Sequence, residues 1–204
     1  MVESFKVSND VAFSNKTNLL RFMTGMGYCM KKARKMLSAW KAPYIQSLMR
    51  LIESQSKTTL VIWAVNYSEL FILPLWHKYY PDDMRPQSAL NAARDWLSGK
   101  IKLPQAKAII LECHSAAREA EENPVAQASA RAIGQCASTI HSARHCIGLA
   151  FYGALAVAYD QIGTDAPWEQ IELYASEECR KMEVSLCEIA VKNEPNPAKI
   201  DWKC

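Results

Sequence analysis

Polar side chains with catalytic or binding chemistry are concentrated between residues 69 and 145 of the 204-residue chain. Carboxylate, guanidinium and imidazole groups are the usual tools of acid–base chemistry and of polar ligand binding. The candidate functional cluster combines all three kinds of group and consists of Glu69, Asp83, Arg85, His114, Arg118, His141 and His145. These residues come from at least four predicted elements, so we expect folding to bring them together. None of them is assigned a catalytic role.

The two histidines His141 and His145 are four residues apart in the predicted helical segment 124–161. On one continuous helix they would face the same side and could share a metal ion. Steps of three and four residues place further small or polar residues on the same stripe, namely Arg131, Gly134, Ser138, Gly148 and Tyr152. No third ligand with suitable spacing accompanies the pair. The sequence therefore predicts no metal and no other cofactor, and leaves coordination by His141 and His145 as an alternative to a hydrogen-bonded network.

Glu69 is the only charged residue between Leu60 and Leu75, the most apolar part of the chain. A buried carboxylate needs a cation or a hydrogen-bond donor, or it takes up a proton. We expect Arg118, Arg131 or a histidine to be the partner, with a position on the wet face of the helix as the equal alternative. The apolar run falls short of the roughly 20 clean residues of a membrane span. It is interpreted as a buried core helix, and no membrane partner is predicted.

Motifs of common enzyme classes are missing from the sequence. There is no phosphate-binding G-x-x-x-x-G-K-[ST], no H-E-x-x-H metalloprotease motif and no G-x-S-x-G nucleophile motif. The turn Asp82-Asp83-Met84-Arg85 also has a purely local interpretation, as a capped turn with an ion pair. A small-molecule- or metal-dependent enzyme that uses the Glu/Asp/Arg/His cluster therefore stands as the alternative to a binding protein.

Helical periodicity and capping signals divide the chain into seven or eight helices, and no segment shows sustained strand alternation. The fold class is predicted to be all-α, a single-domain bundle of mostly antiparallel helices over residues 1–204. It divides into an N-terminal arm with the first helices (1–55), a core (57–161) and an acidic C-terminal helix (165–192). We expect helices at about 18–40, 43–54, 56–80, 83–98, 104–122, 124–161 and 165–192, with Pro74 kinking or dividing the third.

Charge and cysteine usage indicate the compartment and the partners. Residues 1–60 carry ten Lys/Arg and three Asp/Glu, but no nucleic-acid motif accompanies this basic region, so no nucleic-acid partner is predicted. The seven cysteines are odd in number and form no C-x-x-C pair. Together with the polar start of the chain, they predict reduced thiols and a cytoplasmic protein. A homodimer is left open.

Several segments taken together resemble the putative immunity protein family of bacterial toxin–immunity systems. The resemblance covers roughly residues 60–159 and rests on Trp63-Ala64, Glu69, Leu73-Pro74, Tyr80-Pro81-Asp82-Asp83, Arg85-Pro86, Ala89, Ala93, Trp96, His114-Ser115-Ala116-Ala117-Arg118-Glu119-Ala120, Ala130-Arg131-Ala132-x-Gly134, His141, His145, Gly148 and Tyr152. It implies an all-α cytoplasmic protein that binds and neutralises a cognate toxin. Some relatives have Pro-Gly between the two histidines, where this chain has Ser142-Ala143-Arg144. On that pattern His141 would end one helix and His145 begin the next.

The acidic segment 160–188 is the candidate toxin-binding face. It holds eight acidic residues against Arg180 and Lys181. An acidic inhibitor surface would steer association with a basic nuclease toxin. Glu172, Glu177 and Glu178 are the residues predicted to contribute.

Overall fold

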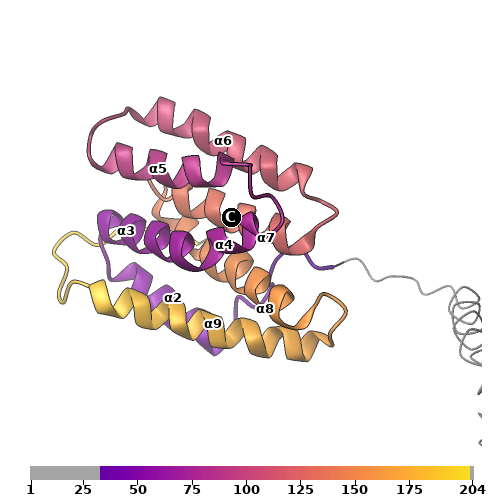
Figure 1. Ribbon diagram of the computed structural model, residues 1–204. Coiled ribbons are helices and arrows are strands. Elements are labelled where there is room, and N and C mark those ends of the chain that lie inside the picture. Colours follow the sequence, from indigo (N-terminus) through magenta and orange to yellow (C-terminus); the bar gives the residue numbers. More distant parts are fainter. Residues whose placement is uncertain (1–32, 203–204) are drawn as a thin grey trace, which may run out of the picture. The chain divides into compact units, whose positions relative to one another are not determined.

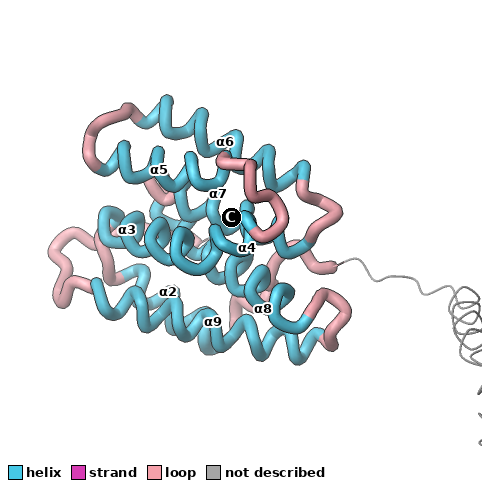
Figure 2. Tube along the Cα trace, in the orientation of Figure 1, coloured by secondary structure: helices cyan, strands magenta, loops and turns pink. Residues whose placement is uncertain are grey.

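The computed structural model describes residues 33–202, and this part of the chain is helical with no strand. The helices are α2 (Pro43–Glu53), α3 (Lys57–Tyr67), α4 (Leu73–His77), α5 (Arg85–Leu97), α6 (Leu103–Glu119), α7 (Pro124–Ser138), α8 (Ala154–Ile162) and α9 (Trp168–Ile189). Since α3 continues into α4 through a π-helical turn, they form seven packed helices (Figures 1 and 2). The all-α prediction is confirmed.

The predicted helix at 18–40 is not found in its described part. Its first part lies outside the described residues. Residues 33–40 are irregular and are fixed by tertiary contacts. The Leu37 amide donates to the Phe151 carbonyl over 3.0 Å, and the Leu37 side chain is fully buried. The hydroxyl of Tyr159 donates to the Arg34 carbonyl over 2.9 Å, which anchors the start of this segment.

Capping residues set the helix boundaries much as the sequence predicts. Pro43 occupies the first turn of α2, where its missing N–H costs nothing. The Ser56 hydroxyl accepts from the Thr59 amide at the start of α3, and the Asn123 side chain accepts from the Ala126 amide at the start of α7, over 3.0 Å. Gly99 follows α5 with φ of 73°, a left-handed conformation that glycine adopts without strain.

Pro74 alters the helix that contains it without ending it. The π-helical segment η1 (Ser68–Ile72) immediately precedes α4, and the Leu73 amide donates back five residues to the Ser68 carbonyl. Pro74 has no N–H to donate, so one helical hydrogen bond is missing at this point. The wider π-helical turn before it accommodates this loss with a bond that spans five residues. Helix α3–η1–α4 (57–77) is also long and apolar enough to span a membrane by length and composition, but 56% of its apolar 18-residue stretch is buried inside this fold.

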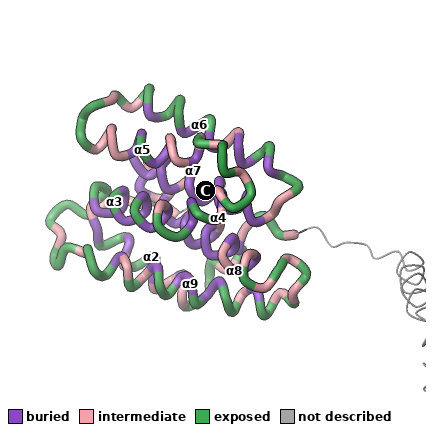
Figure 3. Tube along the Cα trace, viewed as in Figure 1, coloured by how far each residue is buried: buried purple, intermediate pink, exposed green. Residues whose placement is uncertain are grey.

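Helix α7 occupies the centre of the described fold (Figures 1 and 3). It packs against α3, α4, α5, α6 and α8. All of its residues are buried except Pro124, Arg131 and Gln135, which follow one another at steps of seven and four along one line of the helix. Its remaining side chains are mostly Ala, Ser, Cys and Gly, so the surrounding helices approach closely.

The continuous helix expected over 124–161 is wrong. Helix α7 ends at Ser138, a turn follows, and the chain resumes in a 3₁₀ segment, η2 (Ala143–Ile147), and a π-helical segment, η3 (Leu149–Gly153), before α8. Thr139, whose hydroxyl lies 3.4 Å from the Gln135 carbonyl, and Ser142, which is extended at φ −145°, occupy the break. The hydroxyls of serine and threonine compete for the backbone hydrogen bonds of a helix, so these residues favour helix ends. The break matches the alternative in which His141 ends one helix and His145 begins the next.

The central position of α7 gives a stability prediction. Ile133 is fully buried on this helix, so Ile133→Ala should lower the free energy of unfolding by about 2–5 kcal/mol, the usual cost of such a cavity. Leu111 is 62% exposed on α6, and Leu111→Ala should change the free energy of unfolding by no more than about 0.5 kcal/mol. Urea unfolding of the two variants checks this. Equal losses would contradict the burial of α7.

Candidate functional site

Six of the seven predicted site residues separate into three groups, and the seventh, Arg118, lies between two of them. Glu69 forms the first group with α5, not with Arg118, Arg131 or a histidine as expected. The two terminal guanidinium nitrogens of Arg94 donate to its carboxylate, one over 2.8 Å, and Gln87 adds a hydrogen bond of 3.2 Å. The Arg94 hydrogen bonds lower the pKa of Glu69. The Glu69 side chain is 37% exposed, closer to the alternative of a wet helix face than to full burial.

Asp83 and Arg85 form the second group, which joins the start of α5 to the end of α6. The Arg85 guanidinium binds both Asp83 oxygens and also the two oxygens of Glu119, at 3.0 and 2.6 Å. The Asp83 carboxylate also accepts from the Arg85 amide over 3.0 Å, which closes the turn that leads into α5, although the N-cap of this helix is Met84 and has no side-chain cap bond. Hydrogen bonds from Arg85 hold the pKa of Asp83 and of Glu119 below their usual range. The predicted capped turn with a local ion pair is present, and Glu119 extends it.

The three histidines form the third group, around the end of α7. The ring of His114, from α6, lies directly over Gly134, where an added Cβ would be 2.6 Å from the His114 Cε1. The rings of His141 and His145 are 4.9 Å apart between centroids. His145 Nδ1 lies 2.6 Å from the Gln135 Oε1. An amide oxygen only accepts, so Nδ1 carries the proton in this pair.

The electrostatic surroundings of these imidazoles are cationic. Burial is the main cause that lowers the pKa of each histidine, and neighbouring charges add to it; the pKa of His145 falls to about 4. Within residues 33–202, the permanently charged side chains that act on the three rings are all positive: Lys57, Lys107, Arg118, Arg131 and Arg144. Burial and these cations therefore keep the three histidines neutral at pH 7.

Arg118 lies between the second and third groups. It donates to the Ser115 hydroxyl over 2.7 Å, and its charge lowers the pKa of both Glu119 and His114. No hydrogen bond or ion pair links the seven predicted residues across groups in the described part of the chain. In this cluster the carboxylates are engaged by arginines, and none of them bonds to His114, His141 or His145 in the described part of the chain. The structure brings His114, His141 and His145 together with Arg118 beside His114, whereas Glu69 and the Asp83–Arg85 pair bond other partners.

The metal alternative for His141 and His145 also lacks a third ligand. No three His, Cys, Asp or Glu side chains converge as metal ligands among the described residues. The five cysteines in that part are free thiols, and burial raises the pKa of Cys136 and of Cys179 to about 12. Such thiols are poor nucleophiles at neutral pH. Cys29 and Cys204 lie outside the described residues.

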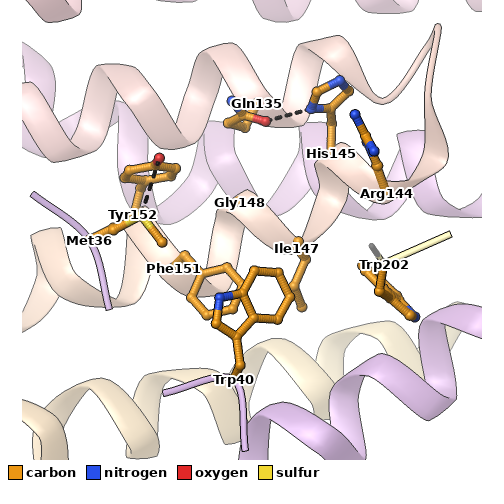
Figure 4. Close-up of a pocket in the computed structure, with 10 residues that line it drawn as sticks. All are labelled: Met36, Trp40, Gln135, Arg144, His145, Ile147, Gly148, Phe151, Tyr152 and Trp202. Atoms are coloured by element: carbon orange, nitrogen blue, oxygen red, sulfur yellow. Dashed lines mark hydrogen bonds between the residues drawn. The ribbon is translucent and has the colours of Figure 1, made fainter. Parts of the chain in front are cut away.

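A pocket of about 240 Å³ adjoins the histidine group (Figure 4). Gln135, Arg144 and His145 lie at one end, and aromatic and apolar side chains line the rest: Met36, Trp40, Ile147, Phe151, Tyr152 and Trp202. The ring centroids of Trp40 and Phe151 are 4.3 Å apart. Sequence reasoning missed Trp40, Gln135 and Trp202, because they are far apart in the chain and no spacing signal connects them.

The acidic candidate face on α9 needs one correction. Glu178 is only 4% exposed and points inward. The hydroxyl of Tyr67 donates to its carboxylate over 2.7 Å, and Lys181 binds the other oxygen at 3.0 Å. Glu172 is half-buried beside Tyr44, whereas Glu177 is exposed. Glu178 therefore stabilises the contact between α3 and α9 and cannot form part of a docking surface.

The contact between His114 and Gly134 predicts a non-additive pair of mutations. Gly134→Ala should lower the free energy of unfolding by about 1–3 kcal/mol, because the new methyl group overlaps the His114 ring. In a His114→Ala background the ring is absent, and the same change should cost little, since alanine is the better helix former. Urea unfolding of the four proteins measures the coupling. Equal costs in both backgrounds would contradict the contact.

The depressed pKa of His145 predicts a pH-dependent stability. An unfolded histidine takes up its proton near pH 6.5, whereas folded His145 does so near pH 4. Between these values the unfolded state binds more protons, so the free energy of unfolding falls as the pH drops from 7 to 5. His145→Gln removes this titration and should lose less stability over the same interval, by on the order of 1 kcal/mol after allowance for solvent access. Urea unfolding of both proteins at pH 7 and pH 5 measures this difference. If the unmodified protein and His145→Gln lost the same free energy of unfolding between the two pH values, His145 would be ruled out as a cause.

Comparison with known proteins places this geometry in a family. Residues 50–185, about two thirds of the chain, match the family described as Imm-5 like putative immunity protein. The matched range contains α3 to α8 and most of α9, so it is wider than the resemblance over residues 60–159. No curated protein and no solved structure matches the chain. The chain belongs to the Imm-5 like putative immunity protein family.

Proposed function

We propose that this protein protects its cell by binding a cognate toxin in the cytoplasm and neutralising it. Family membership over residues 50–185 is the observation that carries the proposal. The separation of the predicted cluster into three groups supports it, because the carboxylates and imidazoles of that cluster are not arranged for a shared reaction. Neutralisation then occurs through contact with the toxin.

The outward side of α9 is the surface that we propose for the toxin. Its inner side packs against α2, α3 and α8. The side that faces away presents large apolar groups, with Leu173 54% exposed and Val184 59% exposed. Exposed Glu177 lies between them along the same side, four residues after Leu173 and seven before Val184. Apolar side chains surrounded by charge are the usual anatomy of a protein interface.

The charges of α9 define the kind of toxin surface that would fit. Glu169, Glu177 and Glu188 are exposed on this side of the helix, together with Arg180 and Lys181. An acidic rim attracts a basic partner and raises the association rate, while the apolar centre supplies most of the binding free energy. We therefore expect a toxin with an apolar patch bordered by basic residues.

Substitutions on α9 should weaken binding of the cognate toxin, for which the products of the neighbouring genes are the first candidates to test. Leu173→Asp combined with Val184→Asp should raise Kd at least 30-fold, about 2 kcal/mol, because each carboxylate would be buried in the complex. Glu177→Lys should mainly slow association and reduce its dependence on salt. Binding kinetics at two salt concentrations, together with survival of toxin-expressing cells, measure both effects.

Matched controls lie on α6, at the edge of the fold opposite α9 (Figure 1). Leu111 is 62% exposed and Glu112 is exposed, so Leu111→Asp and Glu112→Lys repeat the same chemistry elsewhere. These variants should bind and protect like the unmodified protein. Retained binding in the α9 variants would overturn the surface assignment. Absence of both binding and protection in the unmodified protein would overturn the function.

A further inference from the structure

The outer side of α3–η1–α4 carries a largely apolar stripe that no helix of the described structure covers. Its members recur at steps of about four residues along one side of the helix, and all are exposed: Ile62, Asn66, Leu70, Phe71 and Pro74. We propose that this outer stripe is the second half of the toxin-binding surface, beside α9. The inference rests on the proposed function, since it names a further part of the same interface.

Leu70 and Phe71 form the centre of the outer stripe. Leu70 is 66% exposed, the highest value among the large apolar side chains of residues 33–202, and Phe71 is 51% exposed. Both lie in the π-helical turn η1. The missing N–H of Pro74 accounts for that turn, but not for two consecutive large apolar side chains in water. Isolated π turns are frequent at functional sites, and neighbouring exposed apolar side chains mark contacts with other molecules.

The hydrogen bonds between α3 and α9 fix how the two helices run past each other. The Trp63 indole N–H donates to the Met182 carbonyl over 3.1 Å, and the Tyr67 hydroxyl donates to Glu178 over 2.7 Å. An advance of four residues on α3 is matched by a return of four residues on α9, so the two helices are antiparallel (Figure 1).

Phe71 lies where this pairing reaches the exposed part of α9. Its ring packs against Tyr67, with the ring centroids 4.6 Å apart. One further turn along both helices brings Phe71 level with Tyr174, which is 37% exposed and adjoins the exposed Leu173. The outer stripe is therefore continuous with the outward side of α9 at this point, and one partner can contact both.

The usual size of a protein interface favours the larger surface. Stable complexes bury about 800 Å² on each partner, contributed by roughly 20–30 residues. Helix α9 has 22 residues, and its inner side packs against α2, α3 and α8, so its outward side alone falls short of that number. The outer stripe supplies further large apolar groups, and it lies within the family-matched range 50–185.

The charges beside the outer stripe are already paired. The two terminal guanidinium nitrogens of Arg94 bind Glu69, and one of them also donates to Asn66 over 3.2 Å. Paired charges contribute little to long-range attraction. The outer stripe therefore acts through apolar contact and the dissociation rate, whereas the exposed acids of α9 act through the association rate and its salt dependence. The toxin surface that fits is apolar opposite the outer stripe and basic opposite α9.

Binding kinetics of Leu70→Ser with the cognate toxin test the inference. We expect Kd to rise about tenfold or more, mainly through faster dissociation, with the salt dependence of association unchanged, since serine adds no charge. Leu70→Met keeps an apolar side chain and should bind like the unmodified protein. Leu111→Ser is the matched control on α6, where Leu111 is 62% exposed, and should also bind normally. Circular dichroism establishes that each variant is folded.

The possible outcomes separate this inference from the proposed function. Unchanged binding in Leu70→Ser, together with lost binding in the α9 variants, would overturn the inference and leave the proposed function standing. Sedimentation of the protein without toxin is the second measurement, since a homodimer that Leu70→Ser dissociates would assign the outer stripe to a second copy of this chain and overturn the inference. Absence of binding and protection in the unmodified protein would overturn both.

Discussion

The burial of α7 is the constraint on which the rest of the described structure depends. A helix surrounded on nearly every side can carry only small or apolar side chains where its neighbours approach. Here they are mostly alanine, serine, cysteine and glycine, and contacts such as His114 over Gly134 and Gln135 against Gly148 leave no room for a further methyl group. The close approach fixes the positions of α5, α6 and η3 around it. The positions of His114 and of Gln135 beside His145 follow from this packing.

The same burial explains where polar chemistry is located. Only Pro124, Arg131 and Gln135 on α7 are not buried, and the last two lie next to the histidine group. That line is where the central helix reaches the surface. Side chains from α6 and from the turn after α7 converge there because helix packing covers the other faces. The pocket is therefore a consequence of how the central helix ends, and the break at Thr139–Ser142 brings His145 back toward Gln135.

Much of the fold could be predicted from local signals, whereas the site could not. Caps at Ser56 and Asn123 and the first-turn proline Pro43 identify helix ends because their chemistry is local. The break after Ser138 was weakly signalled, since alanine-rich sequence on both sides favours a helix. The ion-pair partner of Glu69 could not be predicted from the sequence. Arg94 is 25 positions away on a different helix, and only the packing of α5 against α3 brings the two charges together.

Charge composition alone is also a poor guide to a binding face. Segment 160–188 is acidic in sequence, yet Glu178 faces the core and its charge is used by Tyr67 and Lys181. Replacing it would leave Lys181 without its carboxylate and the Tyr67 hydroxyl buried without its acceptor, so a lost interaction with a partner could not be separated from lost stability. Leu173 and Val184 make no such internal bond, and they are among the most exposed apolar side chains in the described residues. An exposed leucine or valine gains free energy only when something covers it. The exposed apolar side chains of α9 are therefore a better basis for the docking surface that we propose than the charge count of the helix.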